Sequence, residues 1–548
     1  MQKLYLQFAL FLLIAGAYSI KAQEVPYHIS NQAVYDFIDE LNNKGIIDIN
    51  TAIKPYSRLT IAKALQKANG HASLSKRQQN EINFYLKDFN KELTIGKDFD
   101  KRFDIFYHSD SLFKVTVNPI LGGQFFNNGD KTEYHRWGGA EFYGSIGQNI
   151  GIYGSLRDNH ESRFFGGEQY ITQRPGAVYK GDNLDKDYSE TRGGITYNWK
   201  WGSLGLHKDH FTWGNGYNEA IIHSGQAPSY GYLSFKMTPA KWLEFNYVHG
   251  WLVSEVVDSS RTYHVYNGDR EVYANKFIAA NLFTIKPWRK LHVSFGNSII
   301  YGDTDFNPTY LIPFLFYKSA DHTYNSWDNW VGHNAQMFFD ISSRQIKNLH
   351  LYTSVFIDEI VLTKMFSQTE KSNDIAIKIG GRLTDALPNL SLTAEYTRIR
   401  PLTYEHFIPT VTFKSNNYML GSYMRDNAEE IYLAARYKPI RGLDLQASYT
   451  LMRKGKDYQK IFDNNEEDLH PEINQDQEEI RRGLPFLNEE RYKKQSITFK
   501  ASYQIINDGF IFIEAQHNSI SGPDKDLYTN PYFLTGDNIL SFGMNFGF

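Results

Sequence analysis

The stretch Leu443-Asp444-Leu445-Gln446-Ala447-Ser448-Tyr449-Thr450-Leu451 decides the fold class of this chain. Every odd position is apolar or aromatic and every even position is polar, which is the period of a β-strand with one apolar and one wet face. The segment from Leu390 to Tyr396 alternates in the same way, and so does the C-terminal stretch from Leu540 to Phe548. Because no apolar helices accompany these strands to cover them, the pattern favours strands that face lipid outside and an aqueous lumen inside.

The alternation recurs from about residue 101 onward and predicts roughly eighteen strands. We place these strands near residues 113–125, 134–147, 150–158, 191–200, 203–213, 230–238, 241–252, 271–286, 289–301, 332–343, 347–358, 373–384, 389–400, 428–438, 441–453, 493–506, 509–520 and 536–548. Short connections such as Gln148-Asn149 alternate with long ones such as 302–331. Outer-membrane barrels combine short periplasmic turns with long extracellular loops, and an even strand count leaves both chain ends in the periplasm. The sequence therefore predicts a mainly β fold, a large antiparallel transmembrane β-barrel spanning residues 101–548.

The first residues of the chain are typical of a signal peptide, which we assign to residues 1–22. Lys3 supplies the positive start, an apolar run follows, and Ala22 is a plausible cleavage residue. A membrane-anchoring helix is the alternative, but it would need about 20 apolar residues.

Residues 23–100 have helical spacing and predict a small periplasmic bundle of three amphipathic helices. We expect Ser30 and Ser57 to cap the first two helices. Ser75 and Gln78 fit a capping box at the start of the third.

The composition suits a barrel and argues against several other classes of protein. The chain has no cysteine, so it has no disulfide, no lipid-attachment cysteine and no thiolate metal site. A formal charge of −3 over 548 residues gives no reason to expect a nucleic acid as partner. The 38 Tyr and 38 Phe residues suit the aromatic girdles of a barrel. The tryptophans fit two such belts, one at the short connections and one at the opposite strand ends: Trp199, Trp201, Trp242 and Trp288, then Trp213 and Trp251.

Several short motifs resemble those of the Wzi family of capsule-assembly proteins. Trp213-Gly214-Asn215-Gly216-Tyr217 is a Trp-Gly-rich turn, and His223-Ser224-Gly225-Gln226-Ala227-Pro228 is a polar stretch ending in Ala and Pro. The other motifs are Asn307-Pro308-Thr309-Tyr310-Leu311, Asp328-Asn329 and Phe356-Ile357-Asp358-Glu359. The resemblance covers the chain from about residue 110 onward. The stretch from Tyr27 to Leu86 is also similar to Wzi-like barrels of gliding bacteria, the RemB-like subgroup of gliding-motility proteins.

This resemblance implies an eighteen-stranded outer-membrane barrel whose periplasmic end is closed by a helical bundle. It also implies a role in holding capsular polysaccharide at the cell surface. Asn215 and Gln226 stand where family members often carry Pro and Arg, so the identity of the ligand stays open. The terminal Phe548 resembles the signal that the barrel insertion machinery uses, which makes that machinery an expected partner.

The long loops carry residues that could bind a glycan. Sugar sites pair aromatic faces, which stack on sugar rings, with amides and carboxylates that hydrogen-bond the hydroxyl groups. The residues expected to bind glycan are Trp213, Asn215, Tyr217, His223, Asn307, Tyr310, Trp327, Asp328, Asn329 and Trp330. The alternative is that these aromatic residues pack the loops against each other over the barrel mouth.

Other possible sites have weaker support in the sequence. The segment from Asp463 to Glu479 carries eight acids but lacks the spacing of a calcium loop, so a solvated loop is the better interpretation. The motifs of serine hydrolases, zinc peptidases and phosphate-binding loops are missing.

We therefore expect a non-enzymatic outer-membrane protein without a cofactor that binds or organises capsular or extracellular polysaccharide. Its expected partners are outer-membrane lipid, the polysaccharide and the insertion machinery. One alternative is an accessory of gliding motility or of a surface secretion machine. A porin or uptake channel is a further alternative, because a barrel of this size can hold an open lumen.

Overall fold

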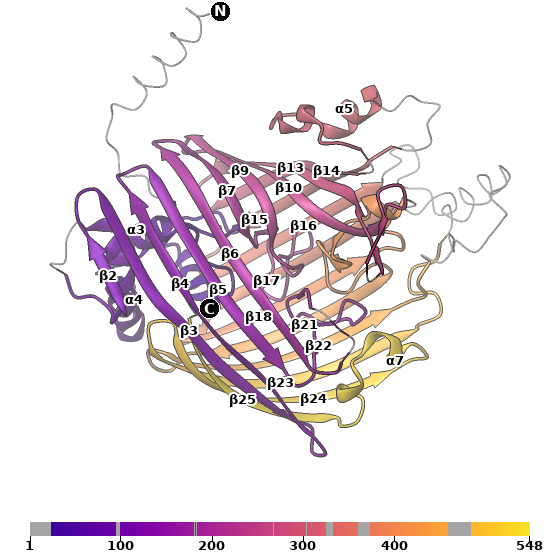
Figure 1. The fold of residues 1–548 in the computed structure, drawn as a ribbon. Coiled ribbons are helices and arrows are strands. Elements are labelled where there is room, and N and C mark those ends of the chain that lie inside the picture. The colour runs from indigo at the N-terminus through magenta and orange to yellow at the C-terminus, as the bar shows by residue number, and fades with distance from the viewer. Residues whose placement is uncertain are drawn as a thin grey trace, which may run out of the picture.

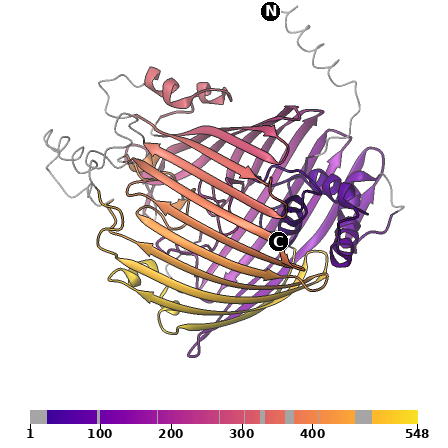
Figure 2. The same ribbon diagram turned by 180° about the vertical axis from the view of Figure 1, so that it is seen from behind.

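A computed structural model describes residues 24–94, 99–179, 181, 183–266, 268–302, 304–324, 332–359, 373–406, 408–458 and 484–547. Within these residues the chain forms a closed antiparallel barrel of eighteen strands, with helices at one end (Figures 1 and 2). Its strands are β3 (Phe113–Asn127), β4 (Thr132–Ile146), β5 (Ile150–Glu161), β6 (Lys186–Trp199), β7 (Gly202–Asp209), β9 (Tyr230–Ala240), β10 (Leu243–Val257), β13 (Tyr273–Trp288), β14 (Leu291–Gly302), β15 (Asn334–Ser343), β16 (Leu349–Glu359), β17 (Asp374–Leu387), β18 (Leu390–Ile399), β21 (Ala428–Tyr437), β22 (Leu443–Lys454), β23 (Tyr492–Ile506), β24 (Gly509–Ser521) and β25 (Asn538–Phe546). This architecture confirms the fold class expected from the sequence.

The barrel closes where its last strand pairs with its first. Strand β25 pairs with the second half of β3, from Phe546 opposite Leu121 to Leu540 opposite Asn127. The short strand β2 (Phe106–Ser109) pairs with the first half of β3. The edge of β3 is therefore hydrogen-bonded along most of its length, as a closed barrel requires.

The alternation in the sequence separates the outer face of the wall from the lumen. On β25, the side chains of Leu540, Phe542 and Met544 are about half exposed on the outer face, whereas Ser541 is buried inside. On β22, Tyr449 lies opposite Ile497 and Leu433 of the neighbouring strands, so apolar side chains form a continuous outer row. Such rows suit a lipid-facing wall.

The two ends of the barrel differ in their connections. At the short-turn end, strands are joined by a few residues, such as Asn507-Asp508 between β23 and β24. Asp508 has a φ of 58°, the left-handed conformation that tight turns need. The opposite end, here the long-loop end, carries the extended connections. Their elements are β8 (Thr212–Trp213), β11 (Tyr263–Val265), β12 (Gly268–Arg270), η1 (Pro308–Leu311), α5 (Tyr317–Tyr324), η3 (Pro409–Val411), β19 (Lys414–Ser415), β20 (Tyr418–Met419), α7 (Lys525–Tyr528) and η5 (Pro531–Phe533).

Three N-terminal helices pack around a small core of their own: α2 (Gln32–Asn43), α3 (Arg58–Ala68) and α4 (Lys76–Leu93). Ser57 caps α3, and Ser75 with Gln78 forms the expected capping box of α4. The prediction that Ser30 caps the first helix is wrong, because Asn31 precedes α2 and the Ser30 hydroxyl lies 2.7 Å from His28 Nδ1. Within the described ranges, no helix combines the length and the apolar composition needed to cross a membrane.

The N-terminal helices close the short-turn end of the barrel through polar contacts. Lys44 Nζ lies 2.8 Å from Asp385 Oδ2 near the end of β17, and Arg77 Nε donates to Asn389 Oδ1 in the β17–β18 turn. The Tyr85 hydroxyl donates to Gln504 of β23 at 2.9 Å. On the far side of the opening, Lys91 Nζ donates to the Tyr143 hydroxyl of β4 at 3.3 Å. Because the contacts reach strands on different sides of the barrel, the helices lie across its opening (Figure 2).

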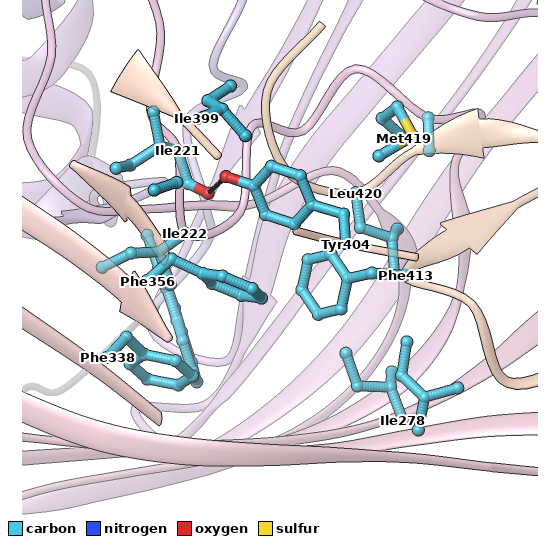
Figure 3. Packing of buried hydrophobic residues seen from close by; sticks show 14 of the residues in the cluster. Ile221, Ile222, Ile278, Phe338, Phe356, Ile399, Tyr404, Phe413, Met419 and Leu420 are labelled. Atoms are coloured by element: carbon cyan, nitrogen blue, oxygen red, sulfur yellow. Dashed lines mark hydrogen bonds between the residues drawn. The ribbon is translucent and has the colours of Figure 1, made fainter. Parts of the chain in front are cut away.

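Two long connections fold back into the lumen instead of covering it from outside. We call residues 210–229, 400–406 and 408–427 together the lumen plug. Its apolar side chains, such as Ile221 and Tyr404, pack against inward-facing residues of the wall, such as Phe338 and Phe356 (Figure 3). The Tyr404 hydroxyl donates to the Ile221 carbonyl at 2.6 Å, which joins the two connections.

The inward course of residues 210–229 shows that two predictions were wrong, one on the end of β7 and one on Trp213. Strand β7 ends at Asp209, four residues earlier than expected, because the chain turns inward there. Trp213 is therefore buried in the lumen at 3% exposure and is no part of an aromatic belt. Its backbone pairs with Ile53 of β1 (Ile53–Lys54), so the N-terminal region meets the plug inside the barrel.

The connection after β14 takes the opposite course and lies against the outer wall. We call residues 304–324, which include η1 and α5, the outer cover. Helix α5 lies outside the barrel beside β13 and β14 (Figure 1). The outward-facing Asn281 donates to the carbonyls of Pro313 and Leu315 at 3.0 and 2.9 Å. Asn297, also outward, accepts from the Tyr317 backbone N–H at 2.9 Å. Polar groups on a lipid-facing wall need protein partners, and the outer cover supplies them.

Candidate functional site

The structure places the predicted residues of the first motif inside the lumen. Asn215 Nδ2 donates to Asp340 Oδ1 at 2.6 Å, and the Asn215 backbone N–H donates to Asp340 Oδ2 at 2.9 Å. Its Oδ1 accepts from the hydroxyl of Thr51 at 2.6 Å. Protein groups therefore use both ends of the amide, and the side chain is 3% exposed.

Tyr217 is held in the same way by groups of the wall and the N-terminal region. Its hydroxyl lies 2.8 Å from His350 Nδ1, and Asn43 Nδ2 donates to it at 3.3 Å. The guanidinium of Arg382 lies over the ring, 3.5 Å from its centroid. This face of the ring is therefore already covered by a cation and is not open to a sugar.

His223 is a buried neutral imidazole. Its Nδ1 lies 3.0 Å from the Phe211 carbonyl and so carries the proton, while Nε2 accepts from the Tyr230 hydroxyl at 2.7 Å. The ring stacks on Phe211 with centroids 4.0 Å apart. Burial lowers the pKa of His223 to about 3, so this side chain stays uncharged at neutral pH.

A group of buried acids beside the lumen plug was not anticipated from the sequence. The backbone N–H of Tyr217 donates to Glu395 Oε1 at 2.5 Å, and Asn218 Nδ2 donates to Glu430 Oε1 at 2.6 Å. Burial raises the pKa of Glu219, whose carboxylate accepts from the Ser422 hydroxyl at 2.6 Å. The sequence did hold a signal for these acids, because Glu395 and Glu430 occupy inward positions of their strands. Only the fold shows that both contact residues 217–219.

Two other predicted residues, Asn307 and Tyr310, lie on the outer side of the wall. Asn307 caps η1, with its Oδ1 accepting from the Thr309 backbone N–H at 3.0 Å. Tyr310 is fully buried in the outer cover and donates to Asp321 Oδ1 at 3.2 Å. The barrel wall therefore separates these two residues from Trp213, Asn215, Tyr217 and His223. The remaining predicted residues lie outside the described ranges: Trp327, Asp328, Asn329 and Trp330.

An exposed aromatic surface lies elsewhere at the long-loop end, on the hairpin of β11 and β12. Tyr266 at its tip is 100% exposed, and Tyr263 is 51% exposed. His264 Nδ1 lies 2.9 Å from Asp269 Oδ1 on the paired strand, and the guanidinium of Arg270 lies 6.0 Å from the Tyr263 ring centroid. Two open aromatic faces beside charged groups match the chemistry of a glycan site. The sequence signal was the pair of tyrosines three residues apart in a long connection.

Two cavities among the described residues do not suit a sugar enclosed in the lumen. One cavity of about 100 Å³ lies between the N-terminal region and the wall, lined by Glu24, Lys54, His207 and Trp213 among others. Small-molecule sites typically have roughly 300–1,000 Å³. A hollow of about 690 Å³ is lined by outward residues such as Leu383 and Leu433, so it belongs to the lipid-facing wall.

Comparison with known proteins finds likeness in structure only. No protein-family model and no curated protein sequence matches the chain. Among solved structures, "Wzi, an outer membrane protein involved in group 1 capsule assembly in Escherichia coli" matches with a TM-score of 0.57 and 12% identity, over 96% of this chain and 100% of that one. The outer membrane protein OprD of Pseudomonas aeruginosa reaches a TM-score of 0.41 at 10% identity, over 79% of this chain and 93% of its own. OccAB2 of Acinetobacter baumannii reaches 0.43 at 7% identity, over 79% and 97%.

The match to Wzi spans both the barrel and the N-terminal helices, whereas the two other likenesses are too weak to support an argument. The eighteen-stranded closed barrel and its N-terminal helical region agree with that match. This chain therefore has the fold of the Wzi-type outer-membrane β-barrel.

Proposed function

We propose that this protein is a non-enzymatic outer-membrane protein that binds or organises surface polysaccharide. The observation that carries the proposal is the filled lumen. The N-terminal helices lie across the short-turn end, and the lumen plug packs against the inner wall below the long-loop end. A barrel filled in this way is suited to holding a polymer on its outside rather than to passing it through.

The orientation follows from the connections. Outer-membrane barrels have short periplasmic turns and long extracellular loops. The short-turn end and the N-terminal helices then lie in the periplasm, and the hairpin of β11 and β12 projects from the cell surface. The match to Wzi supports the ligand class, since that protein is described as a carbohydrate-binding β-barrel.

The glycan contact is proposed for the exposed tyrosines of the hairpin, together with the predicted Trp327 and Trp330. Rings of this kind stack on the apolar face of a sugar, and each such contact contributes a free energy on the order of 1 kcal/mol. The buried residues Asn215 and Tyr217 would act on binding only indirectly, by holding the lumen plug in place.

The test is binding of surface polysaccharide, extracted from the producing cells, to the purified protein in detergent. We expect Tyr263→Ala with Tyr266→Ala to weaken binding at least fivefold. The matched control is Tyr437→Ala, which removes a tyrosine of similar exposure (43%) at the short-turn end. A well-folded double variant that binds as tightly as the control would remove the hairpin from the site.

Two further measurements address the whole proposal. A deletion strain should release polysaccharide from its surface, and unchanged retention would contradict the proposed function. Recording in a planar bilayer should show no steady large conductance, whereas such a conductance would support the channel alternative. The accessory role in gliding or secretion stays a prediction, which neighbouring motility or secretion genes would favour.

A further inference from the structure

Two histidines from distant parts of the chain face each other inside the barrel. His28 precedes α2 in the N-terminal region, and His210 follows the last residue of β7 directly. His28 Nε2 lies 3.3 Å from His210 Nδ1. The carboxylate of Asp209 joins them, with its Oδ1 3.7 Å from His28 Nε2 and 3.9 Å from His210 Nδ1. All three side chains are nearly buried, at 11%, 7% and 1% exposure for His28, His210 and Asp209.

A second carboxylate lies beside the group. Glu190 of β6 places its Oε1 3.6 Å from His210 Nδ1. A tetrahedral ion with bonds of about 2.0–2.2 Å to nitrogen and oxygen leaves its ligand atoms roughly 3.3–3.6 Å apart. The distances among His28, Asp209 and His210 are 3.3, 3.7 and 3.9 Å, within a few tenths of an ångström of that range, whereas Glu190 lies outside this group of mutually close ligand atoms. Small side-chain rotations would therefore bring two nitrogens and one oxygen around one centre, and the fourth position would be taken by water or, after a larger movement, by Glu190.

The surroundings of the group suit a metal ligand set. Burial favours the neutral form of a histidine, which is the form that coordinates an ion. The hydroxyl of Ser30 lies 2.7 Å from His28 Nδ1, and the Ser30 backbone N–H donates to the same nitrogen at 3.3 Å. Coordination through Nε2 would place the proton on Nδ1, with the Ser30 hydroxyl as its acceptor and the backbone contact given up. A cavity of about 40 Å³ adjoins His28 and Asn31, which is enough room for a water molecule beside the group.

Three nearby cations oppose an added ion, because the charges of Arg192, Arg157 and Lys208 act on His28 or His210. Arg192 Nη1 donates to Asp209 Oδ1 at 3.2 Å, so one acid of the group is already paired. Glu190 supplies a second negative charge, and a carboxylate has about four lone-pair sites that can serve several partners. The competing account is a direct hydrogen bond between the two imidazoles, which needs no ion.

We propose that His28, Asp209 and His210 form a binding site for one divalent first-row transition ion of the zinc type, beside the carboxylate of Glu190. Two imidazoles with a carboxylate are a ligand set that such ions favour over Ca²⁺ or Mg²⁺. The ion would cross-link the N-terminal region to the barrel wall, since His28 comes from the former, Asp209 is the last residue of β7 and His210 follows it. This site is independent of the proposed glycan binding.

The experiment uses the full chain, purified in detergent without a histidine tag, stripped with a chelator and titrated with Zn²⁺. We expect one equivalent to bind, and both His28→Gln and His210→Gln to weaken the affinity at least tenfold. Glutamine keeps a hydrogen-bonding side chain but is a poor zinc ligand. The control is His264→Gln, which removes an exposed histidine that also lies 2.9 Å from an aspartate, and it should bind Zn²⁺ like the unaltered protein.

Heat-modifiable gel mobility reports whether each variant has an intact barrel. Binding of no ion by the unaltered protein overturns the proposal, and so does unchanged affinity in either well-folded glutamine variant. If a variant fails to fold, the absorption spectrum of the unaltered protein with Co²⁺ decides. Intense visible bands of a four-coordinate ion with nitrogen and oxygen ligands support the site, and the weak spectrum of hexahydrated Co²⁺ overturns it.

Discussion

The packing of the N-terminal helices against each other and against the barrel depends on a buried arginine, and its removal gives the sharpest prediction. Arg58 Nη2 lies 2.9 Å from Asp88 and its Nε 2.7 Å from Glu92, with all three side chains at most 9% exposed. Its guanidinium also lies 4.0 Å from the ring centroid of Tyr143 on the barrel wall. Arg58→Met keeps the volume of the side chain but leaves the two acids without this partner.

The expected loss is about 3 kcal/mol of the free energy that holds the helices in place. Removing one partner of a buried ion pair costs about 3–5 kcal/mol. We take the lower end because Asp88 keeps Lys91, whose Nζ lies 3.0 Å away. Lys87→Met is the matched control: its partner Asp100 also lies at 3.0 Å, but the pair is 43% and 77% exposed. An exposed pair of this kind contributes about 0–1 kcal/mol.

The assay is urea-induced loss of helical circular dichroism at a wavelength where the barrel contributes a constant signal. With a slope of about 1 kcal/mol per molar urea, Arg58→Met should lower the midpoint by roughly 3 M. Lys87→Met should lower it by less than about 1 M. The reasoning is refuted if the two variants shift the midpoint equally while both barrels remain intact.

Three other predictions follow from contacts of the described residues. Acid should release the helices: burial by itself raises the pKa of Asp88, but the charges of Arg58 and its neighbours outweigh this and hold that pKa well below its ordinary value. The stability that ionised Asp88 contributes is nearly complete above pH about 4 and is lost as the pH falls below that value. The urea midpoint should therefore drop between pH 5 and pH 3. An unchanged midpoint would contradict this prediction. Asn281→Leu with Asn297→Leu removes the hydrogen bonds that hold the outer cover. Each lost hydrogen bond should cost about 0.5–1.5 kcal/mol. Protease should therefore cut residues 304–324 sooner than in the unaltered protein, while the barrel stays intact. Equal cleavage rates would show that apolar packing alone holds the cover. Tyr404→Phe leaves the buried Ile221 carbonyl without its hydrogen-bond donor, at a cost of about 1–3 kcal/mol. This loss should speed the amide hydrogen exchange of residues 219–224. An unchanged exchange rate would refute the role of Tyr404 in holding the two connections together.

The sequence by itself determined the barrel and its N-terminal helices. A period of two is a local property, so the stretch from Leu443 to Leu451 predicts a strand independently of the rest of the chain. The caps at Ser57 and Ser75 are equally local, since each hydroxyl bonds a backbone N–H three residues later. Ser30 shows the limit of such rules, because a contact with His28 engages the same hydroxyl.

Only the tertiary structure decided where the long connections go. Residues 210–229 and 304–324 look alike in sequence, since both are polar and rich in aromatic residues, yet one fills the lumen and the other covers the outer wall. Their partners are distant in the chain: Trp213 pairs with Ile53, and the outer cover is held by Asn281 and Asn297. Asn281 and Asn297 are polar residues in an outward row, which was the one sequence signal for a cover. Loops carry no period, so their course is set by which distant polar and apolar groups they can satisfy, and that depends on the closed barrel.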